Sequence, residues 1–225
     1  MKLERLQRRL GHQFGDPDLL RRALTHRSAG ARNNERLEFL GDAILGFEVA
    51  ENLYRRHPGA SEGELSRARA QLVKRETLAQ VARRLGLGEY LILGPGELRS
   101  GGQNRDSILS DAVEALIAAV FEDAGMEAAR ALVRRLLEEE LAAATPGEQL
   151  KDAKTRLQEW LQSRGLALPN YQVVNLEGSA HDQTFTVACR VGDLAPETRG
   201  QGSSRRKAEQ QAAAAMLERL EAQGS

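Results

Sequence analysis

The chain has 225 residues, which predicts one or two domains with enough length to bury a core. Lys and Arg (32) balance Asp and Glu (32), so bulk charge indicates no partner, and 41% hydrophobic residues exclude wholesale disorder. The longest unbroken apolar run, residues 115–121, is far shorter than the roughly 20 residues of a membrane span. The charged N-terminus lacks an apolar signal core, and a single cysteine, Cys189, cannot form an internal disulfide. We therefore expect a cytoplasmic protein with no membrane partner.

Residues 1 to about 144 are predicted to be helical, because apolar residues recur at spacings of three and four. Turn-forming residues interrupt the pattern at 15–17, 57–59 and 94–96. Ser61 and Glu64 match a capping box, which predicts a helix from there through Leu72 and Val73. An Ala- and Glu-rich segment, residues 128–144, ends at Thr145-Pro146-Gly147, which we interpret as a linker.

The pattern changes after this linker. A helix is predicted at 152–164, three strands at 171–176, 184–191 and about 196–200, and a last helix at 203–221. The second strand alternates apolar residues, and Cys189 lies among them as an expected core thiol. The order α-β-β-β-α indicates a small α+β module behind the helical part.

Acidic residues gather on two strongly apolar helical segments. At about 100° per residue, Glu35, Glu38 and Asp42 share one stripe, with leucine and isoleucine on the opposite face. Asp111 and Glu114 share a face of the second segment, and no basic residue occurs at 112–121. A helix that is apolar nearly all round is normally buried, and acids there repel one another unless a cation compensates.

Two interpretations of these acids remain open from the residues alone. Each group by itself is typical of a solvated acidic face. Together they favour a hard cation such as Mg²⁺, which prefers carboxylate oxygens. One cysteine and four scattered histidines give no zinc spacing, and a di-iron bundle would need Glu-x-x-His pairs. We expect His26 and His57 to be turn or interface residues.

Residues 34–42, Asn-Glu-Arg-Leu-Glu-Phe-Leu-Gly-Asp, match the signature of the ribonuclease III family. Segments 24–28, 95–102 and 110–115 resemble bacterial members in the same order, so the similarity covers nearly the whole chain. The step from a carboxylate metal site to a double-strand ribonuclease comes from this resemblance.

The resemblance implies roles for individual residues. The implied ligands of Mg²⁺, for which Mn²⁺ is expected to substitute, are Glu38, Asp42, Asp111 and Glu114. Asp42 and Glu114 would be tied most directly to catalysis. Glu35 matches a carboxylate that shapes the site or acts on scission, and Glu62 matches one near the substrate path. Glu64 is left to helix capping.

The C-terminal module resembles a double-stranded RNA-binding domain, which reads the shape of A-form RNA. The resemblance implies RNA contacts by Thr155, Gln158, Glu159 and Gln162 on the first helix, by His181 in a loop, and by Ser204, Arg205, Arg206 and Lys207 on the last helix. Alone, the run 205–207 is typical of a solvated helix start. Glu209 stands where many such domains have Lys, so we expect a missing phosphate contact there. Trp160 is expected to pack in the core.

The resemblance implies a multidomain protein: an all-α endonuclease domain at 1–145, a linker at 146–151 and an α-β-β-β-α RNA-binding domain at 152–225. The implied enzyme is a C₂ homodimer that cuts double-stranded RNA, leaving 5′-phosphates, 3′-hydroxyls and two-nucleotide 3′ overhangs. Ribosomal RNA precursors and other structured transcripts, including mRNA and tRNA precursors, are the implied substrates, and no DNA partner is expected. The alternatives are a regulator that binds double-stranded RNA without cutting it and, less favoured, a metal-storing helical bundle.

Overall fold

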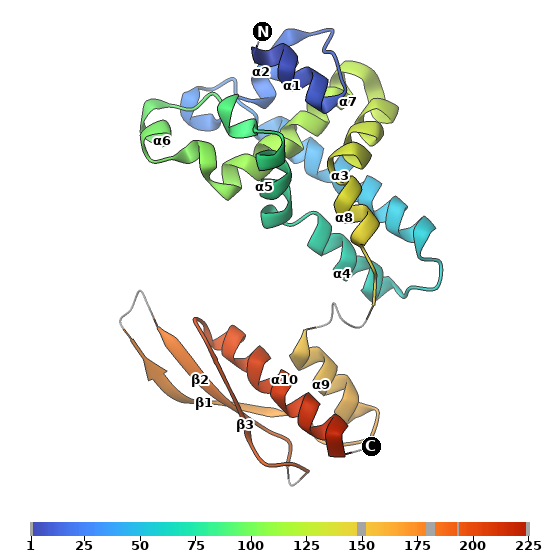
Figure 1. Ribbon diagram of the computed structural model, residues 1–225, viewed down its shortest axis with the longest axis vertical. Helices are drawn as coiled ribbons and strands as arrows, with labels where there is room; N and C mark the ends of the chain where they lie inside the picture. The colour runs from blue at the N-terminus through green and yellow to red at the C-terminus, as the bar shows by residue number, and fades with distance from the viewer. Residues whose placement is uncertain (1, 148–151, 179–182, 193, 224–225) are drawn as a thin grey trace. The chain divides into compact units, whose positions relative to one another are not determined.

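The computed structural model describes residues 2–147, 152–178, 183–192 and 194–223. The chain divides into two compact units, Met1–Pro146 and Gly147–Ser225. The first unit is helical, and the second combines two helices with a sheet (Figure 1). None of the helices within these described ranges has the length and apolar character that a membrane crossing requires.

The first unit is built around one long helix, α7. The helices in chain order are α1 (Lys2–Leu10), α2 (Pro17–Ala23), α3 (Glu35–Arg56), α4 (Glu62–Leu72), α5 (Arg75–Arg84), α6 (Pro95–Arg99), α7 (Asp106–Leu136) and α8 (Glu138–Ala143). Single 3-10 turns at Arg27–Ala29, Leu87–Glu89 and Gly102–Asn104 lie in the connections. The first half of α7 is almost entirely buried, because α3, α5 and α2 pack around it (Figure 1).

Side-chain caps and a proline define the first residues of several helices. The Asp16 side chain caps α2 by accepting a hydrogen bond from the Asp18 N–H. Both bonds of the capping box between Ser61 and Glu64 are present, which confirms the predicted start of α4. Residues 94–96, predicted as a turn, instead contain the start of α6 at Pro95. The missing N–H of proline costs no helical hydrogen bond at this position.

A break inside α7 is tied to the loop that precedes α2. Gly125 has φ +80° and ψ −176°, a conformation that glycine adopts without a Cβ clash. Just before it, the Asp123 carboxylate accepts hydrogen bonds from Gly15 N and Asp16 N and lies 2.7 Å from His12 Nε2. These contacts hold the N-terminal loop against α7.

The second unit confirms the predicted order α-β-β-β-α. Its elements are α9 (Ala153–Gln162), β1 (Asn170–Glu177), β2 (Thr184–Arg190), β3 (Thr198–Gly202) and α10 (Arg205–Gln223). The strands form an antiparallel sheet in the order β1-β2-β3. The core includes Leu157, Cys189 and Met216, and Trp160 packs against it, as expected for both Cys189 and Trp160.

The third strand starts and ends later than predicted. The sequence suggested about 196–200, with the segment 200–202 leading into the last helix, whereas β3 continues through Gly202. A Cβ atom at Gly200 would lie 2.2 Å from Ala212 N, and one at Gly202 would lie 2.7 Å from Lys207 Cβ. The glycines therefore allow α10 to approach the strand closely.

Candidate functional site

The N-terminal half of α3 presents acids on one side and buries apolar residues on the other. The buried apolar side chains of this half are Leu37, Ile44 and Leu45. Glu35 and Glu38 lie in the first turn, where the helix dipole favours carboxylates, and Asp42 follows one turn later. The expectation that this helix is buried on nearly every side is wrong, because Phe39 is 82% exposed.

Helix packing brings acids from α3 and α7 together. Carboxylate oxygens of Glu38, Asp111 and Glu114 all lie within 4.8 Å of one another, and the three side chains are half-buried. Three of the four predicted metal ligands therefore form one cluster. Asp42 and Glu35 lie outside this group of oxygens and are exposed, although the charge of each acts on the cluster.

Gly41 determines how closely α3 approaches α7. A Cβ atom at this position would lie 1.8 Å from the main-chain oxygen of Glu114. Only glycine permits this approach, which places residues flanking Gly41 beside the acids of α7. The sequence pattern alone did not assign Gly41 a role, since Gly46 of the same helix has nothing within 4 Å of its Cβ position.

The cluster carries a strong electrostatic penalty in the chain itself. Burial, together with the smaller effects of the negative charges of Asp42, Asp111 and Glu38, raises the pKa of Glu114 to about 8. Burial also raises the pKa of Glu38, and Asp111 and Glu35 add to that effect. A divalent cation would relieve both the desolvation and the mutual repulsion, so this donor set fits a hard metal ion.

Side chains from other elements also act on the acids of the cluster through their positive charge, which the sequence did not predict. Burial raises the pKa of Asp111, and a hydrogen bond from Ser110 opposes this effect. Three further groups also lower it through their charge: Arg75, His26 and Arg27. Arg27 Nη1 also lies 3.7 Å from Glu35 Oε1. His26 and His57 both lie at helix boundaries, as expected for turn residues.

The two acids at the start of α4 do not join the cluster. Glu62 is exposed and accepts a hydrogen bond from Ser66 Oγ at 2.6 Å. Glu64 Oε2 accepts from the Ser61 N–H at 2.8 Å, so the capping role expected for Glu64 is confirmed.

The first part of the implied RNA surface lies on α9. Asp152 caps this helix by accepting from the Thr155 N–H at 2.8 Å. Four exposed residues recur at helical spacing along it: Thr155, Gln158, Glu159 and Gln162. Leu157 and Leu161 are buried on the other side. His181, the implied loop contact, lies outside the described residues.

The second part lies at the start of α10. Ser204 Oγ accepts from the Lys207 N–H at 3.3 Å, while Arg205, Arg206 and Lys207 are exposed. Glu209 is not a surface residue, since it is only 8% exposed. Because many such domains have Lys at position 209, the sequence analysis predicted only a missing phosphate contact. It did not predict that Glu209 is buried.

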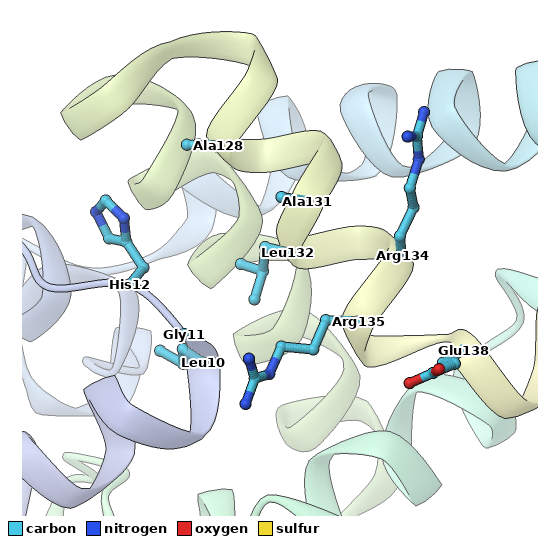
Figure 2. A pocket seen from close by; sticks show the side chains of 9 residues that line it. All are labelled: Leu10, Gly11, His12, Ala128, Ala131, Leu132, Arg134, Arg135 and Glu138. Carbon is cyan, nitrogen blue, oxygen red and sulfur yellow. The ribbon is translucent and has the colours of Figure 1, made fainter.

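A groove of about 440 Å³ lies elsewhere in the first unit, between the end of α1 and the second half of α7. Its lining includes Leu10, His12, Leu132 and Glu138, and none of the predicted site residues. Figure 2 shows Arg135 directed toward Gly11 at the C-terminal end of α1, where a positive charge is favourable. We assign this groove no part in the chemistry.

Two family profiles match the two units. One, described as "Ribonuclease-III-like", matches residues 16–141, and the other, "Double-stranded RNA binding motif", matches residues 153–220. Ribonuclease 3 of Actinobacillus pleuropneumoniae serotype 3 is 58% identical over 220 residues, which cover 98% of this chain and 99% of that relative. Ribonuclease 3 of Methylococcus capsulatus is 58% identical over 217 residues, 96% of this chain and 94% of the relative.

Solved structures agree for the first unit. The nuclease domain of ribonuclease III from Campylobacter jejuni aligns with a TM-score of 0.60 at 43% identity, over 61% of this chain and 97% of that chain. A helical nuclease domain with an acidic cluster, followed by a double-stranded RNA-binding domain, is thus the class of protein observed. The chain belongs to the ribonuclease III family and is an enzyme of that type.

Proposed function

We propose that the protein is a Mg²⁺-dependent endoribonuclease that hydrolyses phosphodiester bonds in double-stranded RNA. The observation that carries the proposal is the cluster of Glu38, Asp111 and Glu114, formed where α3 and α7 meet at Gly41. The same chain carries a double-stranded RNA-binding motif at residues 153–220, which supports the choice of substrate.

The proposed metal ligands are Glu38, Asp42, Asp111 and Glu114, and Mn²⁺ is expected to substitute for Mg²⁺. Carboxylate oxygens are the donors that these hard cations prefer. When bound, the ion supplies an activated water and stabilises negative charge on the leaving oxygen. The raised pKa of Glu114 supports its assignment, because an uncompensated buried carboxylate is costly without a cation.

The residues around the cluster suit the remaining tasks of hydrolysis. In the reaction, a water oxygen bonds to phosphorus, the bond from phosphorus to the 3′ oxygen breaks, and the 3′ oxygen takes up a proton. The products are therefore a 5′-phosphate and a 3′-hydroxyl. Glu35 and Glu62 are proposed to shape the site and the substrate path. The positive charges of Arg27 and Arg75 next to the acids favour an anionic substrate strand.

We further propose that two chains act as a C₂ homodimer, since one acidic cluster cuts one strand. An exposed stripe on α3 supports this proposal: Phe39, Phe47 and Tyr54 are 82%, 50% and 72% exposed and fall on one side of the helix. The related nuclease domain from Campylobacter jejuni is described as having structural flexibility in a region involved in dimer formation. Paired sites across a duplex would leave two-nucleotide 3′ overhangs.

The C-terminal domain is proposed to hold the duplex. We assign residues 1–145 to the catalytic domain, 146–151 to a linker and 152–225 to the RNA-binding domain. The assigned RNA contacts are Thr155, Gln158, Glu159, Gln162, His181, Ser204, Arg205, Arg206 and Lys207. Cytoplasmic processing of ribosomal RNA precursors and other structured transcripts is the proposed role.

A single substitution tests the assignment of the cluster. Glu114→Gln keeps the size of the side chain but removes the charge that holds the metal. It should abolish cleavage of an RNA duplex in Mg²⁺ while leaving the affinity for the duplex, measured in EDTA, unchanged. Glu76→Gln removes an exposed acid of the same unit and should cut normally. Undiminished cutting by Glu114→Gln would remove Glu114 from the metal site.

A further inference from the structure

A buried acid lies directly behind the basic start of α10. Glu209 is 8% exposed, and its two carboxylate oxygens accept hydrogen bonds from two different cations. Oε1 accepts from Arg205 Nε at 2.8 Å, and Oε2 accepts from Lys154 Nζ at 2.5 Å. Glu209 therefore joins α10 to α9 through Lys154 and also holds Arg205, which lies one turn earlier on α10.

Lys154 fixes the position of this carboxylate. Its ammonium group lies 4.6 Å from the centre of the Tyr171 ring on β1, and its backbone N–H donates to Gln210 Oε1. Lys154 is thus held by contacts to two other elements of the domain, β1 and α10. The carboxylate of Glu209 is consequently a fixed acceptor and cannot follow a mobile partner.

Arg205 is held at only one of its nitrogen positions. The bond to Glu209 uses Nε, and neither amino group of the guanidinium has a partner among the described residues. The side chain remains 63% exposed. A guanidinium fixed at Nε still offers two parallel N–H donors, the geometry that binds phosphate in a bidentate manner.

We propose that Glu209 is a positioning residue for RNA binding, which holds Arg205 so that its free amino groups meet a phosphate of the duplex. The inference rests on the proposed RNA-binding function of the C-terminal domain. Ordering a long side chain before binding removes an entropic cost from association. The acid at position 209 therefore strengthens RNA binding, although its charge alone would repel phosphate.

The direction of the change in RNA affinity on removing Glu209 distinguishes a positioning role from simple charge repulsion. The full chain would be titrated in EDTA, which prevents cutting, against an RNA duplex longer than the about 16 base pairs that one such domain spans. Glu209→Gln should weaken binding by about three- to tenfold, and Arg205→Gln should weaken it similarly. In the Arg205→Gln background, Glu209→Gln should have no effect or tighten binding, because Arg205 is no longer there to position.

A control separates position from net charge. Glu218→Gln removes the same charge from an exposed position of the same helix and should leave binding unchanged or slightly tighter. Circular dichroism checks that each variant folds. If Glu209→Gln does not fold, Arg205→Gln can still be measured, because it keeps the contact between Glu209 and Lys154. Unchanged or tighter binding by Glu209→Gln, or no loss with Arg205→Gln, would overturn the inference. Failure of the unaltered chain to bind the duplex would instead contradict the proposed function.

Discussion

Gly41 on α3 lies in direct contact with the main-chain carbonyl of Glu114 on α7, with no room for a Cβ atom between them. The two helices approach closely at this point, beside the acidic cluster. The spacing of Glu38 from Asp111 and Glu114 therefore depends on the absence of a side chain at position 41.

Gly41→Ala should consequently displace α3 from α7. A Cβ placed 1.8 Å from a backbone oxygen cannot be accommodated by a rotamer change, so we expect a loss of about 3 kcal/mol in the free energy of unfolding. Cleavage should fall at least tenfold even where the protein remains folded, because the carboxylates separate. Urea unfolding and cleavage of a duplex measure the two effects.

Gly59→Ala is the matched control for this substitution. Gly59 follows α3 in a loop, and a Cβ there would have nothing within 4 Å. It should change stability by no more than about 0.5 kcal/mol. Equal stability and activity of the two variants would show that the contact at Gly41 does not set the geometry of the cluster.

Stability without metal should fall as pH rises. The pKa of Glu114 is raised from 4.5 to about 8 by burial and by neighbouring carboxylates, so the folded chain binds more protons than the unfolded chain between these values. In EDTA, the thermal midpoint should therefore decrease from pH 5 to pH 8, and Glu114→Gln should reduce that decrease. Calorimetry across this range measures the slope.

Bound Mg²⁺ should oppose this fall of the thermal midpoint with rising pH. Because Mg²⁺ competes with the proton on Glu114, it should raise the thermal midpoint more at pH 8 than at pH 5. A midpoint with the same pH dependence in the wild type and in Glu114→Gln would contradict the assigned burial and repulsion of this carboxylate.

The exposed aromatic stripe on α3 predicts the effect of a surface substitution on assembly. Phe39→Ala should raise the dissociation constant of the homodimer by at least about tenfold, since large aromatic residues dominate interface energies. Leu98→Ala removes an apolar side chain that is 54% exposed from α6 and should leave the dimer intact. Sedimentation velocity distinguishes the outcomes, and a monomeric wild type would contradict the proposed assembly.

Salt dependence tests the contacts at the start of α10. Arg206 is exposed and belongs to the proposed RNA surface. Arg206→Gln should lower the slope of log affinity against log salt by about 0.9, because one phosphate contact releases one condensed cation. Arg219→Gln removes the same charge from the far end of α10, where Arg219 donates to the Pro196 carbonyl, and should keep the slope. A slope unchanged in Arg206→Gln would place the contact elsewhere.

Periodic patterns in the sequence predicted the fold class and grouped the acids on two helical segments, whereas the choice of four metal ligands came from the resemblance to the ribonuclease III family. Apolar spacing indicated helices, and three of the four proposed ligands lie in one cluster. The cations at Arg27 and Arg75 were not predicted, because they belong to a 3-10 turn and to α5, outside the two acidic segments. The end of β3 was misjudged because Gly202 was expected to lead into the last helix, whereas its close contact with α10 is a tertiary feature.

The proposed activity would be measured by cleavage of an end-labelled RNA duplex, resolved to single nucleotides, in Mg²⁺ and in EDTA. A metal-dependent dimeric endoribonuclease should cut both strands in Mg²⁺ only, at positions offset by two nucleotides, and leave 5′-phosphates. Tight binding of the duplex with no cutting in Mg²⁺ or Mn²⁺ would contradict the proposed activity and would favour a regulator that binds double-stranded RNA without cutting it.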